Sequence, residues 1–144
     1  MRLFLDTNVI LDIPLGREGA QSSEQALELC GELAHLVFTS WHTLSTLSYI
    51  LAKARDDQTA RAFMSGLLDL VEIGPSSTEL ARKALAIGLN DLEDAMQVVV
   101  AEAVAADLII TRNLRDFSRS PAGRLREAGQ PGMIRQWSCE VHAR

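Results

Sequence analysis

The sequence predicts an α/β protein in which helices cover both faces of a parallel sheet. Short apolar runs alternate with longer stretches in which apolar residues recur at helical spacing. Continuous apolar runs are typical of parallel strands buried on both faces, and the intervening helices connect one strand to the next. The chain has 144 residues and shows neither an internal repeat nor a linker-like segment, so we expect one domain over residues 1–144.

Five segments are expected to be strands, because each is short, apolar and bounded by polar or turn-forming residues. They are residues 2–5, 36–39, 70–73, 107–111 and 133–135, the last being the weakest. The first of them runs directly into Asp6, and the third is stopped by Gly74 and Pro75.

Helices are expected between these strands, each beginning at a residue type that caps helix N-termini. The expected caps are Ser22 or Ser23, Ser40, Asp56, Ser77 or Thr78, and Asn90. The helix that begins at Asn90 runs to about Ala106 and is apolar on nearly all sides, which is typical of a buried helix. A loop containing Pro14 and Gly16 is expected after the first strand, and a short helix at residues 121–128.

Composition excludes several classes of protein. No uncharged apolar run reaches eighteen residues, so a membrane span is not expected. Residues 1–13 are not a signal peptide, because Asp6 and Asp12 interrupt them and no cleavage site follows. Cys30 and Cys139 lack the spacing of a zinc site or a disulfide framework, which favours a cytoplasmic protein. Cys30 lies in an apolar helical pattern and is expected in the core.

The net charge of −5 is unusual for a protein that binds nucleic acid without specificity. The charges are unevenly distributed, since residues 111–144 carry seven arginines and three acids, whereas residues 1–110 carry seven bases and sixteen acids. An acidic site beside a basic C-terminal quarter fits this split, and so does a fluctuation without meaning. Charge alone therefore does not decide the function.

Polar side chains gather at the carboxyl ends of the predicted strands, where open parallel sheets bind their ligands. Asp6 follows the first strand, and Asn113 and Asp116 follow the fourth. Asp91 and Asp94 lie at the start of the preceding helix, and their spacing of three places both on one helix face. The sequence therefore predicts one cluster of acids at this edge of the sheet.

Clustered carboxylates repel each other, so their folding together is unfavourable unless a cation lies among them. Oxygen ligands without His or Cys favour Mg²⁺ or Mn²⁺, and such ions activate water and neutralise phosphate charge. Simpler explanations exist for Asp6 as a turn residue, for Asp91 as an acid at a helix N-terminus, and for Asp116 as loop polarity. Asp94 is harder to explain in this way, because it begins an otherwise apolar face and a buried acid needs a partner.

Three segments resemble, in order and spacing, the motifs of the PIN-domain (PilT N-terminus) family. They read LDTNVI from Leu5, DLEDAMQ from Asp91 and IITRNLRDF from Ile109, and the resemblance extends over roughly residues 2–137. It implies a three-layer α/β/α fold with a central parallel sheet of about five strands, and a ribonuclease activity that depends on Mg²⁺ or Mn²⁺. Many bacterial members are toxins of VapBC-type pairs, so it also implies three partners: RNA, a small antitoxin protein and a second copy of the chain.

The sequence departs from the family pattern at two positions. The family usually carries a glutamate on the helix after the second strand, where this chain has Thr46, and often an aspartate where it has Asn113. The combination of Asp91, Asp94, Asn113 and Asp116 resembles a subgroup in which Asp91 and Asp116 make up the lost charge.

The resemblance and the spacing together assign roles to nine residues. Asp6, Asp91, Asp94 and Asp116 are expected to be the catalytic and metal-binding carboxylates. Asn8, Thr46 and Asn113 are expected to position water or phosphate, and Arg112 and Arg115 to bind the RNA backbone. A solvated loop explains the arginines equally well.

Three further side chains have ordinary explanations. Trp41 and Trp137 are expected to pack against other side chains rather than to stack on bases, and His42 is expected to be a surface residue.

Two other functions remain open. A PIN fold with threonine at position 46 is compatible with a catalytically inert module that binds RNA or a protein partner. A different α/β enzyme that phosphorylates Asp6 is disfavoured, because position 8 is Asn rather than a second Asp and no glycine-rich phosphate loop is present.

Overall fold

A computed structural model describes residues 1–32, 36–113 and 133–136 of the chain. Its centre is a parallel sheet of five strands in the order β3-β2-β1-β4-β5. The strands are β1 (Arg2–Leu5), β2 (Leu36–Thr39), β3 (Glu72–Ile73), β4 (Leu108–Thr111) and β5 (Met133–Gln136). The predicted α/β class and the predicted sheet of about five strands are confirmed.

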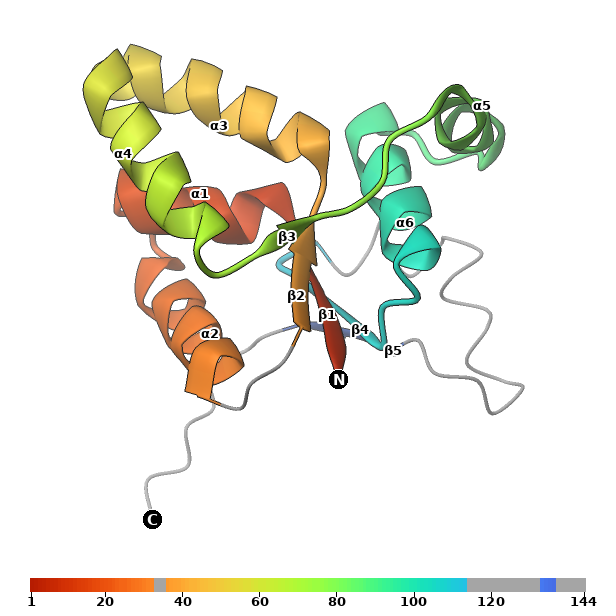
Figure 1. Cartoon of the computed structure of the whole chain (residues 1–144), viewed down its shortest axis with the longest axis horizontal. Helices are drawn as coiled ribbons and strands as arrows, with labels where there is room; N and C mark the ends of the chain where they lie inside the picture. The colour runs from red at the N-terminus through yellow and green to blue at the C-terminus, as the bar shows by residue number, and fades with distance from the viewer. Residues whose placement is uncertain (33–35, 114–132, 137–144) are drawn as a thin grey trace.

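Helices cover both faces of the sheet, which gives three layers (Figure 1). One face carries α1 (Thr7–Leu15), α2 (Ala20–Glu32), α3 (Trp41–Ala54) and α4 (Asp57–Leu68). The other face carries α5 (Thr78–Ala86) and α6 (Leu92–Ala103). None of the described helices has the length and apolar character that crossing a membrane requires.

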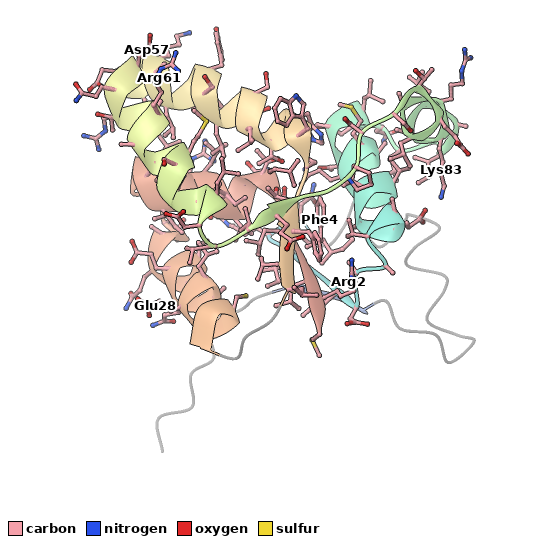
Figure 2. The ribbon with its side chains drawn as sticks, viewed as in Figure 1. Arg2, Phe4, Glu28, Asp57, Arg61 and Lys83 are labelled. Carbon is pink, nitrogen blue, oxygen red and sulfur yellow. The ribbon has the colours of Figure 1, made fainter. Side chains whose placement is uncertain are left out.

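The residues of β1 alternate between two cores, as the period of two in a strand requires. Leu3 and Leu5 pack with residues of the α1–α4 layer, whereas Phe4 packs against α6 through Val98 and Ala101. Figure 2 shows Phe4 beside β1 in the middle of the molecule, with Asp57 and Lys83 at its periphery. Cys30 is buried in the first core, as expected, and burial raises the pKa of its thiol.

The prediction of a loop after β1 is wrong, because Thr7–Leu15 forms the helix α1. Asp6 caps this helix, and its residues Val9, Ile10 and Leu11 are buried, so tertiary packing outweighs the helix-breaking tendency of proline. Pro14 lies one residue before the end, where little helix remains to be disrupted. Gly16 ends the helix in a left-handed conformation (φ 58°) and donates its N–H to the last turn.

Several boundaries differ from those expected. Helix α2 begins at Ala20, before the expected cap at Ser22 or Ser23, and α6 is capped by Asp91 rather than by Asn90. Strand β3 begins at Glu72 rather than at position 70, because the N–H groups of Leu70 and Val71 bond back to α4. Other predicted boundaries are confirmed. They are the helix caps at Ser40, Asp56 and Ser77 and a strand that begins at Met133. The helix expected at 121–128 lies outside the described residues.

We predict that Gly74→Ala destabilises the fold by about 1–3 kcal/mol, the usual effect of overpacking a core. Gly74 lies directly after β3, and a Cβ at this position would overlap the Val100 side chain of α6 and crowd that of Val104. The matched control is Gly66→Ala in α4, where a Cβ meets no atom within 4 Å, and we expect it to stabilise by about 0.5–1 kcal/mol. Urea unfolding measures both, and equal effects of the two variants would contradict the prediction.

Candidate active site

The N-terminal ends of α1, α3 and α6 meet at the carboxyl edge of the sheet (Figure 1). Helix α1 begins two residues after the end of β1, and α3 begins two residues after the end of β2. Helix α6 has its first turn at the same edge. This is the edge at which parallel sheets bind their ligands. The residues expected to be functional are therefore described from this edge outward.

Asp6 is completely buried at the end of β1 and accepts three hydrogen bonds. Its Oδ1 accepts from the backbone N–H of Asn8 (3.2 Å) and from Gln97 Nε2 (3.1 Å), and its Oδ2 accepts from Thr111 Oγ1 (2.7 Å). Gln97 also accepts the N–H of Thr7 through Oε1 (3.1 Å). A buried carboxylate is stable only with such donors, so Asp6 ties β1 to α6 and to β4.

Asp94 lies in the first turn of α6 and is only 6 % exposed. Its Oδ2 accepts a hydrogen bond from Asn113 Nδ2 at 3.3 Å. The backbone N–H of Asn113 donates to Thr111 Oγ1 (2.9 Å), and the same hydroxyl donates to Asp6. Two buried acids are thus joined through Thr111, the last residue of β4, and Asn113, two residues beyond it, which brings Asp6, Asp94 and Asn113 together.

Asp91 differs from Asp94 in backbone conformation and in exposure. It is the N-cap of α6, with an extended backbone (φ −97°, ψ 118°), and its exposed carboxylate accepts the N–H of Glu93 at 2.8 Å. The expectation that both acids belong to the first helical turn is therefore wrong, because a spacing of three shares a face only when both residues are helical. Within the described residues, no three acidic, His or Cys side chains are grouped closely enough to hold a metal ion.

Of the remaining predicted residues, the structure describes Asn8, Thr46 and Arg112. Asn8 is exposed and contributes its backbone N–H, and Thr46 is half-buried one turn into α3. Asp116 and Arg115 lie outside the described residues, so their roles stay predictions.

A chain of hydroxyls that sequence reasoning missed connects α3 to the site. Thr43 is buried, and its Oγ1 is hydrogen-bonded to Thr7 Oγ1 (2.9 Å) and to Ser40 Oγ (2.7 Å). Ser40 Oγ lies 3.3 Å from Nε2 of His42, whose pKa is lowered by burial. His42 is thus half-buried rather than a surface residue. Polar residues within apolar stretches of the sequence, such as Gln97 among the valines of α6, are the pattern from which such buried polar contacts could have been predicted.

Arg112 forms an ion pair within the chain. Its Nη1 lies 2.8 and 2.9 Å from the two carboxylate oxygens of Asp12, which is fully buried in α1. Ser23 donates to the same carboxylate (3.4 Å), and Arg17 lies 3.9 Å from it. Asp12 was not expected to matter, and it directs the Arg112 guanidinium towards α1.

Comparison with known proteins identifies the family of this chain. The PIN domain profile matches residues 2–115, which include Asp6, Asp94 and Asn113. The chain belongs to the PIN-domain family. No curated protein matches it.

Solved structures of VapBC complexes and VapC toxins share the fold of this PIN domain. VapBC2 from Rickettsia felis, bound to a promoter DNA fragment, superposes with a TM-score of 0.72 at 18% identity, covering 96% of this chain and 100% of the other. DNA-bound VapBC from Salmonella typhimurium gives 0.68 at 22%, covering 96% and 99%. VapC20 from Mycobacterium tuberculosis, described as a toxin that cleaves the sarcin–ricin loop, gives 0.62 at 16%, covering 91% and 98%.

We predict that Arg112→Gln destabilises the fold by about 1–3 kcal/mol, because it leaves the buried Asp12 carboxylate short of its main donor. The double variant Asp12→Asn/Arg112→Gln should lose less than the sum of the single variants, since the two residues interact directly. The control is Lys83→Gln, which breaks a 2.6 Å but solvent-exposed pair with Glu102 and should cost at most about 1 kcal/mol. Urea unfolding of the four variants decides, and additive losses would contradict the pairing.

We predict that His42 makes the protein less stable in acid. Burial lowers the pKa of His42 from its ordinary value of 6.5, so the unfolded chain takes up this proton more readily than the folded chain. The free energy of unfolding should therefore fall as the pH falls through 6.5. Unfolding measured between about pH 7.5 and 5.5 should show a flatter dependence for His42→Gln than for wild type, and parallel curves would disprove it.

Proposed function

We propose that this PIN domain is a single-domain, cytoplasmic endoribonuclease that hydrolyses RNA phosphodiester bonds with Mg²⁺ or Mn²⁺. The observation that carries the proposal is the pair of buried carboxylates, Asp6 and Asp94, joined through Thr111 and Asn113. Asp6 also caps α1 and Asp94 lies in the first turn of α6, but an exposed acid serves a helix end equally well, so these roles do not explain why both carboxylates are buried. A cation is the partner that two neighbouring buried acids favour.

The donor set fits a hard divalent cation. Asp6 and Asp94 would hold it, with Asp116 and Asp91 completing the set directly or through water, and all of these ligands are oxygen atoms. A bound ion would activate a water and neutralise charge on the phosphate. With Asp91 serving as a helix cap, its contribution is best supported as one made through water.

The chain's own residues then orient the reaction. Thr111 and Gln97 fix both oxygens of Asp6, and Asn113 fixes one oxygen of Asp94, so the carboxylates are held in place before substrate binds. Asn113, Asn8 and Thr46 are proposed to hydrogen-bond water or the scissile phosphate. Arg115 is proposed to bind the RNA backbone, and Arg112 to do so from its position on Asp12.

The toxin role is part of the same proposal. The VapBC structures that share this fold are complexes of a toxin with its antitoxin, which supports a small antitoxin protein as a partner of this chain. We also propose a homodimer, following the same family resemblance.

An inert binding module is the second candidate, and Thr46 favours it. A threonine at the position where the family usually carries glutamate brings no charge to the site. Retention of Asp6 and Asp94 in buried positions favours catalysis instead, because a module that only binds RNA gains nothing from burying two neighbouring acids.

We predict that purified protein cleaves a mixed RNA pool in Mn²⁺, and that EDTA abolishes the cleavage. Asp94→Asn should lower the rate by at least about 100-fold, because it removes one ligand charge from the ion. The matched control is Asp57→Asn, an exposed acid in the first turn of α4, which should cleave like wild type. Folded, Mn²⁺-loaded wild type that binds the RNA without cutting it would instead support the inert module.

A further inference from the structure

A cavity of about 140 Å³ opens between the N-terminus of α3, the segment before α5, and α6. Val99 and Val100 of α6 and Leu80 of α5 form its apolar floor, and Pro75 lies in the segment that leads to α5. Trp41 and His42, the first two residues of α3, complete the lining on the other side. No role described so far uses this cavity.

Trp41 stands out among the lining residues, because its side chain is 64 % exposed. The expectation that it packs against other side chains is therefore wrong. An exposed indole beside an apolar cavity leaves a large aromatic surface open to a ligand. Stacking of nucleobases on such surfaces is the usual way in which proteins bind single-stranded nucleic acid.

The lining of the cavity carries no formal charge at neutral pH. Its polar members are serines and His42, and burial lowers the pKa of His42, which keeps the imidazole neutral. Such a lining offers a phosphate group no cationic side chain, but it suits an uncharged flat ring. The size agrees, since an apolar cavity of about 150 Å³ holds one benzene molecule.

The cavity is connected to the acids through Ser40. Ser40 lines the cavity and is hydrogen-bonded to Thr43, which is bonded in turn to Thr7, the residue after Asp6. Two hydroxyl contacts, of 2.7 and 2.9 Å, thus separate the cavity lining from the residue that follows Asp6, a span that neighbouring nucleotides of one strand can bridge.

We propose that this cavity is a nucleobase subsite, in which Trp41 stacks on one unpaired base of an RNA whose nearby phosphate lies at Asp6 and Asp94. The subsite rests on the proposed ribonuclease function and adds to it a preference for single-stranded RNA, with selection by base at one position. The aromatic face supplies affinity, and the serines and His42 at the cavity edge supply hydrogen-bonding groups for the base.

The test measures binding apart from cleavage. The full chain carrying Trp137→Phe has Trp41 as its remaining tryptophan, so its fluorescence reports on the cavity alone. It is titrated in EDTA with RNA pentamers of A, C, G or U. We expect quenching of Trp41 that differs between the bases. Because the Trp41 variants of this chain contain no tryptophan, the Kd of every variant is measured by the fluorescence anisotropy of dye-labelled pentamers, and it should rise about ten-fold in Trp41→Ala but little in Trp41→Phe, which keeps an aromatic face. Leu85→Ala, an exposed apolar residue of α5 that is not part of the lining, is the control and should bind like the parent.

The outcomes separate this subsite from the nuclease. Quenching and base preference without any cleavage in Mn²⁺ would support the subsite and refute the proposed catalysis. Cleavage with unchanged fluorescence and an unchanged Kd in Trp41→Ala would refute the subsite alone. A change in oligomeric state caused by Trp41→Ala, with RNA affinity intact, would overturn it by showing that the indole binds a second copy.

Discussion

The burial of the Asp6 carboxylate is the constraint on which the rest of the structure depends. A carboxylate with no exposed surface at the centre of a sheet is tolerated only when donors reach both of its oxygens. Those donors come from α6 and from the end of β4, which are separated from Asp6 by about ninety residues or more of chain. The strand order β2-β1-β4 and the docking of α6 are therefore conditions for burying this acid. A rearrangement of either would leave the buried carboxylate without one of its hydrogen-bond donors.

The same requirement explains why polar residues continue outward from Asp6 in two directions. Towards α3, the hydroxyls of Thr7, Thr43 and Ser40 satisfy one another in a buried row. Towards α1, a third buried acid, Asp12, pairs with Arg112, which lies immediately beyond β4. The segment that follows β4 is thus held from both sides, by Asp94 through Asn113 and by Asp12 through Arg112. Such satisfied networks hold side chains rigid, which is what positioning of a metal or a phosphate requires.

Membership of the PIN-domain family follows from a match over residues 2–115, whereas the three solved structures compared above are 16–22% identical to this chain. Function therefore depends on what this chain retains at the edge of its sheet. It retains two buried acids, and it has a threonine at the position where the family usually carries glutamate. The cavity next to Trp41 adds a feature on which the metal chemistry does not depend, and that separation allows binding and cleavage to be measured independently.

From the sequence alone, the fold class, the order of the five strands along the chain, the family resemblance and the meeting of Asp6, Asp94 and Asn113 at one edge could be predicted. These depend on local periodicity and on the rule that parallel strands end together, both of which are visible along the chain. Only the tertiary structure decided that residues 7–15 are helical, that Asp91 caps α6, and that Arg112 pairs with Asp12 a hundred residues earlier. Such choices depend on burial and on which donor arrives within hydrogen-bonding distance. That information lies in the packing of distant segments and in no local pattern.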